Sequence, residues 1–284
     1  MEKAIEIRNL VKRYGDLTAV NSIDITVEKG EIYAILGANG AGKTSTIKMV
    51  LGITNRTSGE IKVFGKEINE VKNLISFVPE EKTFYENLTP RKAISLCKNV
   101  LNFDSDKMEK YIKKFRLPLN KKISTFSHGM KTLLYLSISF SESAELYIFD
   151  EPTWGLDPLM RDEVLEEIRK IAGNGKTVFY TSHILPEVEK VVDKIAIMNR
   201  GKILFEDYLD SAKENFKKVV VPKNTNTDKY TPVYETEIND MKVLYLYKKE
   251  EIEELTKIYP DIEITNMNLE KIFQAIVRGD KYDS

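Results

Sequence analysis

The order of apolar and polar positions predicts that the chain begins with strands. Apolar and polar residues alternate over residues 5–10 and 20–27, which is typical of strands with one exposed face. Residues 32–36, 146–149 and 177–180 are uninterrupted apolar runs, and such runs are typical of strands buried on both faces. The pattern therefore predicts a core of buried strands with a more exposed set of strands before it.

Helices are predicted between the buried runs. One is expected at residues 43–51, directly after the first run, and a strand pair at residues 60–63 and 74–78. Another helix begins at Asp157-Pro158, because aspartate caps helix N-termini and proline is favoured in the first turn. This alternation of strand, helix and strand predicts a mostly parallel sheet.

The pattern becomes helical over residues 89–140, where Thr89-Pro90 has the form of a helix start and charges are dense at residues 104–122. We expect a helical subdomain standing apart from the strand core. After residue 205 the expected elements are shorter: strands at 218–221, 243–247 and 262–265, and helices at 249–258 and 269–277. They predict a small α/β appendage.

Length and composition fit this organisation. The 284 residues suit one main domain with a smaller appendage. The chain carries 43 Lys and Arg against 44 Asp and Glu, so charge gives no reason to expect nucleic acid as the main partner. Its single cysteine, Cys97, lies in an apolar helical pattern and is expected to be a packed side chain rather than a reactive thiol.

No part of the sequence predicts entry into a membrane. The N-terminal residues lack the apolar core of a signal peptide, and no apolar run approaches the roughly 18 residues that a spanning helix needs. We expect a protein that is soluble or peripheral to a membrane.

Residues 37–44, Gly-Ala-Asn-Gly-Ala-Gly-Lys-Thr, match the phosphate-binding pattern G-x-x-x-x-G-K-[ST] between a buried strand and a helix. Glycines let backbone N–H groups close around phosphates, and the helix N-terminus favours the same anion. Lys43 is expected to reach the β- and γ-phosphates, and the Thr44 hydroxyl to bind Mg²⁺. A glycine-rich turn with a surface lysine is the plainer alternative.

An acidic pair follows the second buried run. Asp150 occupies the place of a Walker B aspartate, which holds Mg²⁺ directly or through water. Glu151 points to the other side of the chain, where it can act as general base toward the attacking water. A strand that simply ends in an acidic turn is the alternative, and the P-loop makes it the weaker one.

Four further segments resemble those of the ATP-binding cassette (ABC) superfamily, over about residues 2–205. Residues 126–131, Phe-Ser-His-Gly-Met-Lys, are similar to the signature Leu-Ser-Gly-Gly-x, and residues 154–157, Trp-Gly-Leu-Asp, are similar to the D-loop. His183 resembles the switch histidine, and Tyr14 resembles the aromatic residue that stacks on adenine. Tyr14 could instead be a hairpin-edge aromatic, and His183 a core or capped histidine.

The resemblance implies that ATP and Mg²⁺ bind between two cassettes that face each other head to tail. The nucleotide-binding residues would be Tyr14, Gly37, Asn39, Gly40, Ala41, Gly42, Lys43, Thr44, Ser45, Ser127, Gly129 and Asp157. The catalytic residues would be Lys43, Glu151 and His183, and the metal ligands Thr44, Asp150 and Glu80. Ser127 and Gly129 would act on the γ-phosphate held by the partner chain, and Asp157 would cap its helix and touch the partner.

Two positions depart from the family pattern. His128 stands where the signature has its first glycine, so it can narrow the approach to the γ-phosphate or add a donor if protonated. Glu80 stands where the Q-loop has glutamine, and a carboxylate can still be a Mg²⁺ ligand. His128 leaves open whether a homodimer would have two equivalent sites. At Glu80 the alternative is neutral drift at the tip of a loop.

The resemblance also implies a fold and a division into domains. The fold would be α/β, with a P-loop NTPase core of mixed sheet, an antiparallel β subdomain, a helical signature subdomain and a small C-terminal α/β appendage. Residues 1–206 would form the nucleotide-binding domain, with the helical subdomain at about 85–142. Residues 207–284 would form an accessory or regulatory domain.

Pro79-Glu80-Glu81 and the apolar spacing of residues 268–276 resemble the drug, antibiotic and peptide exporters of the ABC-2 type. This implies an ATPase that powers export through a separate integral membrane permease, as a homo- or heterodimer of cassettes at the cytoplasmic face of the membrane. The alternatives are a nucleotide-gated regulatory cassette and a soluble translation- or DNA-associated ABC protein. The last is disfavoured by a single set of motifs and by the short interval between P-loop and signature.

Overall fold

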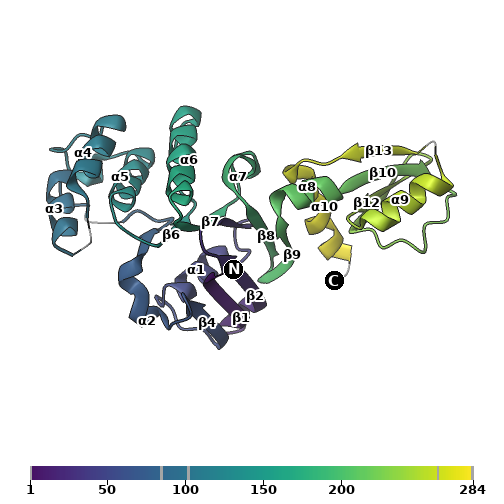
Figure 1. Ribbon diagram of the computed structural model, residues 1–284, viewed down its shortest axis with the longest axis horizontal. Helices are drawn as coiled ribbons and strands as arrows, with labels where there is room; N and C mark the ends of the chain where they lie inside the picture. Colours follow the sequence, from purple (N-terminus) through teal and green to yellow (C-terminus); the bar gives the residue numbers. More distant parts are fainter. Residues whose placement is uncertain (1, 84–85, 101–102, 261, 283–284) are drawn as a thin grey trace.

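The computed structural model describes residues 2–83, 86–100, 103–260 and 262–282 (Figure 1). A six-stranded sheet in the order β5-β6-β7-β3-β8-β9 forms the core, with β9 antiparallel to β8 and the other strand pairs parallel. Its strands are β3 (Ile32–Leu36), β5 (Ile75–Val78), β6 (Leu146–Asp150), β7 (Thr177–Ser182), β8 (Lys194–Asn199) and β9 (Lys202–Tyr208). Every residue of β3, β6 and β7 is buried, so the prediction of three strands buried on both faces is confirmed.

An antiparallel sheet in the order β2-β1-β4 covers one side of this core. It contains β1 (Lys3–Tyr14), β2 (Leu17–Glu28) and β4 (Ser58–Val63), and it packs with helix α1 (Lys43–Val50). β1 and β2 extend beyond the predicted alternation, because Gly15 at φ 57° closes a tight hairpin that pairs Tyr14 with Leu17.

The predicted strand pair at residues 60–63 and 74–78 is wrong, although both strands exist. β4 pairs with β1, whereas β5 pairs in parallel with β6 in the central sheet. Between them, α2 (Ile68–Val71) and a 3₁₀ turn (Lys72–Leu74) redirect the chain. Neighbouring strands in the sequence are therefore not neighbours in a sheet here.

Three helices form the helical part of the chain, at one end of the molecule in Figure 1: α3 (Pro90–Val100), α4 (Ser105–Lys114) and α5 (His128–Phe140). Asp104 caps α4 by accepting from the N–H groups of Asp106 and Lys107, both at 3.0 Å. Tyr111 and Lys114 of α4 donate to Glu167 at 2.9 and 2.8 Å. Glu167 lies on α6 (Pro158–Gly173), so these bonds attach the helical part to the core.

Cys97 on α3 is a buried free thiol, as predicted. Burial raises its pKa to about 11, so the thiol stays protonated at neutral pH.

Among the described residues, no helix combines the length and apolar character needed to cross a membrane.

The appendage contains a separate four-stranded antiparallel sheet in the order β11-β12-β10-β13, at the end of the molecule opposite α3 and α4 (Figure 1). The elements of the appendage are α8 (Leu209–Asn215), β10 (Lys217–Pro222), β11 (Tyr234–Ile238), β12 (Met241–Leu246), α9 (Lys249–Ile258), β13 (Glu263–Asn266) and α10 (Leu269–Tyr282). Helix α7 (Leu185–Val191) precedes them and lies between strands β7 and β8 of the core. The sequence pattern missed β11 and α8. α10 turns back to the core and contacts α7, α8, β8 and β9.

Candidate functional site

The parallel register of the central strands brings the candidate residues to one edge of the sheet. Leu36 lies opposite Ser182, and Asp150 lies opposite Thr181. The P-loop and His183 directly follow β3 and β7, and the acidic pair begins at Asp150, the last residue of β6. Ligands bind at the carboxyl ends of strands in such sheets, so the register alone assembles a site from three distant parts of the sequence.

The P-loop holds a conformation that requires glycine. Gly42 has φ 114°, and a Cβ there would lie 2.5 Å from the Ala19 carbonyl oxygen. At Gly37 a Cβ would lie 2.4 Å from the Met198 carbonyl oxygen. No side chain caps the N-terminus of α1, so its first N–H groups remain available to an anion.

Lys43 is buried and folded back onto its own loop. Its Nζ donates to the Gly37 carbonyl at 2.7 Å and to the Ala38 carbonyl at 3.3 Å. The same Nζ lies 3.5 Å from Glu151 Oε1. The P-loop lysine and the candidate general base are therefore paired across the site.

The two carboxylates of the acidic pair face different partners. Asp150 Oδ1 accepts from the Thr181 hydroxyl at 2.5 Å. Glu151 has φ 50°, an uncommon value for a residue with a side chain, and its Oε2 lies 2.9 Å from His183 Nδ1. Oε1 has no hydrogen-bond partner in the described part of the chain. Such backbone strain is typical of functional sites, and it turns Glu151 away from Asp150 toward His183.

The Thr44 hydroxyl donates to Glu80 Oε2 at 3.4 Å, which brings the P-loop threonine beside the Q-loop position. Hydroxyl and carboxylate oxygens are the ligands that Mg²⁺ prefers, so Thr44, Glu80 and Asp150 fit this ion chemically. The described residues contain no group of three or more His, Cys, Asp or Glu side chains arranged to hold a metal. Mg²⁺ usually binds through one or two carboxylates together with substrate phosphates, so this arrangement is expected for a nucleotide site.

The signature and the D-loop contact each other within the chain. Ser127 caps α5 by accepting from the Met130 N–H at 3.2 Å. A Cβ on Gly129 would lie 2.7 Å from the Gly155 carbonyl oxygen, so this approach requires glycine. Asp157 caps α6 by accepting from the Met160 N–H at 3.1 Å. Both motifs therefore begin helices, as predicted.

The remaining predicted residues lie around this edge. Asn39 and Gly40 are exposed, Ala41 is buried, and Ser45 is half-buried on α1. Tyr14 is 47% exposed at the β1–β2 hairpin, with Lys12 Nζ 4.6 Å from its ring centre. The structure therefore brings together Lys43, Thr44, Glu80, Asp150, Glu151 and His183, whereas no contact joins Tyr14, Ser127 or Gly129 to this group.

Sequence reasoning missed Lys82. This side chain is buried, and its Nζ has no hydrogen-bond partner among the described residues. Burial lowers its pKa to about 8, against the opposing effect of the Asp150, Glu80 and Glu151 carboxylates. Its position two residues after Glu80 was the available signal, but lysines are so often solvated that the sequence could not distinguish it.

Sequence reasoning also missed the role of Glu187. Its carboxylate on α7 accepts from the Thr153 hydroxyl and pairs with Arg161 at 3.0 Å. Arg161 Nε also donates to the Leu156 carbonyl at 2.7 Å. Glu187 thus joins the helix after His183 to the D-loop, a link between segments that only the fold brings together.

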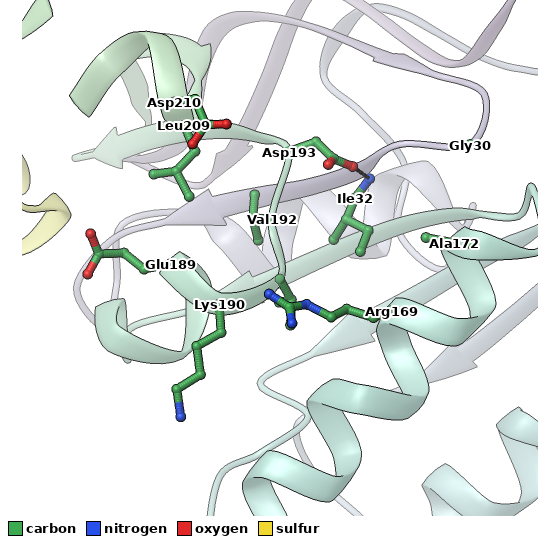
Figure 2. Close-up of a pocket in the computed structure, with 12 residues that line it drawn as sticks. Gly30, Ile32, Arg169, Ala172, Glu189, Lys190, Val192, Asp193, Leu209 and Asp210 are labelled. Carbon is green, nitrogen blue, oxygen red and sulfur yellow. Dashed lines mark hydrogen bonds between the residues drawn. The ribbon is translucent and has the colours of Figure 1, made fainter. Parts of the chain in front are cut away.

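A cavity of about 490 Å³ lies away from this group of residues (Figure 2). It is lined by Gly30 and Ile32 at the start of β3, and by residues of α6, α7 and α8. Asp193 is already engaged there, because its Oδ2 accepts from the Ile32 N–H at 2.8 Å (dashed in Figure 2). This cavity lies at the amino end of β3, opposite the P-loop, so it is not the nucleotide site.

Comparisons with known proteins agree with this geometry. Residues 20–154 match the ABC transporter family. The chain is 36% identical over 226 residues to the bacitracin transport ATP-binding protein of Bacillus licheniformis, covering 77% of this chain and 74% of the relative. It is 35% identical over 212 residues to a lantibiotic transport ATP-binding protein of Streptococcus pyogenes, covering 73% of this chain and 92% of the relative.

Among solved structures, the ATP-binding subunit of an ABC transporter superposes with a TM-score of 0.68 at 28% identity, covering 74% of this chain and 92% of that chain. The predicted α/β fold with a P-loop core is therefore confirmed. The family match includes the P-loop, the signature segment at residues 126–131 and the acidic pair. The chain belongs to the ATP-binding subunits of ABC transporters, which are ATPases.

Proposed function

We propose that this chain is the nucleotide-binding subunit of an exporter, and that it powers export of an antibiotic, peptide or similar molecule through a separate membrane-spanning permease. The observation that carries the ATPase part is the convergence of Lys43, Asp150, Glu151 and His183 at one edge of the sheet. The export part is supported by the relatives named for bacitracin and lantibiotic transport. The chain would lie at the cytoplasmic face of the membrane, attached through the permease.

Lys43 and Glu151 would exchange partners when ATP binds. Phosphate oxygens draw the Lys43 ammonium away from the Gly37 carbonyl and from Glu151. Glu151 Oε1, buried and without a hydrogen bond, is then free to accept a proton from the attacking water. His183 Nδ1 lies 2.9 Å from Oε2 of the same carboxylate, so it would keep Glu151 in place and contact the γ-phosphate.

Bound ATP would lie along the P-loop. The backbone of residues 37–42, with Lys43 and Ser45, would surround the phosphates, and Tyr14 would stack on the adenine. Thr44, Asp150 and Glu80 would hold Mg²⁺, whose charge offsets that of the phosphates. Glu80 already accepts from the Thr44 hydroxyl, which supports a shared role for these two residues.

The complete site would require two cassettes. Ser127 and the Gly129 backbone, at the N-terminus of α5, would donate to the γ-phosphate held by a second ATPase chain. Asp157 would lie at the same interface. Residues 1–206 would form this nucleotide-binding unit, with the helical part at about 85–142, and residues 207–284 would form the accessory domain.

The test is the Glu151→Gln variant, with its molar mass measured by light scattering with and without Mg-ATP. Without its base the protein should bind ATP but not hydrolyse it, so a dimer should appear only with Mg-ATP. Lys43→Met serves as control, because it should remain monomeric in both conditions. A monomer of Glu151→Gln with ATP bound would contradict the homodimer. Dimerisation of the wild type without ATP turnover would indicate a nucleotide-gated regulator instead.

A further inference from the structure

A cavity of about 160 Å³ lies in the appendage, where helix α10 meets the four-stranded sheet. It is lined by Lys218 of β10, Tyr234 of β11, Tyr245 of β12, and Lys271, Gln274, Ala275 and Arg278 of α10. These lining residues include three cations and no carboxylate. The proposed ATPase site uses none of them.

The sheet side of the cavity is one row of side chains. Tyr234 lies opposite Tyr245, and Tyr245 lies opposite Lys218, so all three share one face of the sheet. The two tyrosine rings have centroids 5.5 Å apart. The row therefore presents a pair of aromatic rings beside a single ammonium group.

The helix side is one face of α10, since residues 271, 274, 275 and 278 follow the spacing i, i+3, i+4, i+7. A helix face that meets a sheet is normally apolar, but only Ala275 is buried on this one, and Lys271, Gln274 and Arg278 are exposed along the cavity. The apolar face of α10 points elsewhere: Leu269, Ile272 and Ile276 are buried in the main core. The helix thus lines the cavity with a basic face.

Helix α10 packs closely against the appendage sheet beside the cavity. A Cβ on Gly279 would lie 2.1 Å from the Val233 carbonyl oxygen, at the residue before β11. Only glycine allows this approach of helix and strand.

The three cations have no acidic partner among the described residues. Within the described ranges, Lys218, Lys271 and Arg278 form no ion pair, whereas Lys229 and Lys248 of the same appendage do. Arg278 lies 6.0 Å from the centre of the Tyr234 ring. The carboxylate of Glu270 accepts from Gln274 at 3.5 Å rather than from a cation. Like charges that converge repel each other, and a bound anion would offset that repulsion.

We propose that this cavity binds the phosphate group of a phosphate monoester, held by Lys218, Lys271 and Arg278, with the rest of the ligand against Tyr234 and Tyr245. A volume of about 160 Å³ corresponds to roughly five water molecules, which suits a phosphate head group but not a whole nucleotide. A phosphate monoester carries a charge of about −1.5 to −2 at neutral pH, and it matches three cations better than a carboxylate does. The arginine fork adds a bidentate contact.

Ligand binding here would act on a helix that is tied to the cassette at both ends. The Leu269 N–H donates to Glu189 on α7 at 3.1 Å, and Asn199 donates to Asp280 at 2.7 Å. α7 begins two residues after His183 and also carries Glu187, which pairs with Arg161, and Arg161 donates to Leu156 of the D-loop. Binding of a small phosphorylated molecule at this site is therefore coupled, through α10 and α7, to the part of the cassette around His183.

The test is calorimetric titration of the full chain with phenyl phosphate, with the P-loop first filled by saturating Mg-ADP. The wild type should bind, and the Lys271→Ala/Arg278→Ala variant should bind at least about tenfold more weakly, since each removed contact is charge-assisted. The matched control is Lys249→Ala/Lys257→Ala on α9, which removes the same charge and should change the affinity less than about twofold. Both variants should retain the wild-type circular dichroism spectrum, because the altered side chains are exposed.

Two further probes identify the source of the phosphate. Inorganic phosphate tests a free anion, and vesicles containing phosphatidic acid test a lipid head group, each against the same variants. Loss of vesicle binding alone in the Lys271→Ala/Arg278→Ala variant assigns the site to lipid, and loss of soluble binding alone assigns it to a metabolite. No binding of any probe by the wild type, or equal binding by all variants, would overturn the proposal.

Discussion

The imidazole of His128 packs edge-on against the indole of Trp154, with ring centroids 4.2 Å apart. His128 is the signature residue that departs from glycine, and Trp154 begins the D-loop. Burial, with smaller effects from Lys82 and Lys131, lowers the pKa of His128, so the ring is neutral at pH 7. The departure from the family pattern therefore joins two motifs, both expected at the dimer interface, through an aromatic contact.

Replacing Trp154 by Ala should affect the interface more than the fold. Trp154 is 46% exposed, so the loss of the ring contact should lower the free energy of unfolding by only about 1 kcal/mol. ATP turnover should fall by about tenfold or more, because the signature loses its aromatic contact with the D-loop. Thermal unfolding and steady-state ATPase assays measure both. Leu159→Ala, at an exposed position of α6, is the control. If Trp154→Ala and Leu159→Ala lost the same fraction of ATPase activity, the ring contact between His128 and Trp154 would not matter for turnover.

The His128 ring also fills the space next to Gly155. Gly155 has φ 79°, and a Cβ there would lie 2.3 Å from His128 Cδ2. Gly155→Ala should lower the free energy of unfolding by about 2–3 kcal/mol, from backbone strain plus overlap with the ring. Gly15→Ala measures the strain alone, because Gly15 has φ 57° and no atom near its Cβ position.

Adding His128→Gly to Gly155→Ala should restore the part of the free energy of unfolding that was lost through overlap of the new Cβ with the His128 ring. Urea denaturation of the single and double variants forms the corresponding cycle. If Gly155→Ala lowers the free energy of unfolding by no more than Gly15→Ala does, the His128 ring does not constrain the D-loop.

Lys82→Met should stabilise the nucleotide-free protein. The ammonium group is buried without a hydrogen bond, and no carboxylate of the described residues lies within ion-pair distance. Its desolvation cost therefore exceeds the attraction of the nearby acids, and removing it should raise the free energy of unfolding by up to about 3 kcal/mol. Urea denaturation at pH 7 checks this, with Lys249→Met as the exposed control. A loss of stability would mean that Lys82 is held by the acids of the site.

Much of the fold and of the site could be predicted from the sequence because the signals were local. The buried runs at β3, β6 and β7 and the glycine pattern before Lys43 each depend on residues adjacent in the chain. Parallel strands bring their carboxyl ends to one edge of the sheet, and there Asp150 lies opposite Thr181. The ligand roles of these residues stay predictions until a nucleotide is bound.

What the sequence could not predict depends on contacts between distant residues. Glu187 binds Thr153 and Arg161 across the fold, and nothing near it in the sequence marks it. Strand β11 is half-exposed and rich in charge, so it resembles a loop, and it exists because β12 pairs with it. The adjacency of β4 and β5 in the sequence suggested a pair, whereas their buried faces belong to different sheets.

Glu142 gives the chain a pH-dependent stability. Burial raises the pKa of this carboxyl from its usual value of 4.5 to about 7, and a hydrogen bond with Ser76 opposes this effect. Between pH 4.5 and 7 the folded state keeps a proton that the unfolded state releases. The free energy of unfolding should therefore fall as pH rises through this window and lose up to about 3 kcal/mol above it, at about 1.4 kcal/mol per pKa unit.

Glu142→Gln should remove this dependence, because the amide resembles the protonated carboxyl and never ionises. The variant should be more stable than the wild type at pH 8, and the difference should vanish near pH 4.5, where Glu142 is protonated in the folded state. Urea denaturation at the two pH values measures the difference. Glu145→Gln is the control, because this exposed residue pairs with Lys176 at 2.6 Å at the surface and should change stability by less than about 1 kcal/mol at either pH. An equal effect of Glu142→Gln at both pH values would show that Glu142 ionises in the folded protein as it does in water.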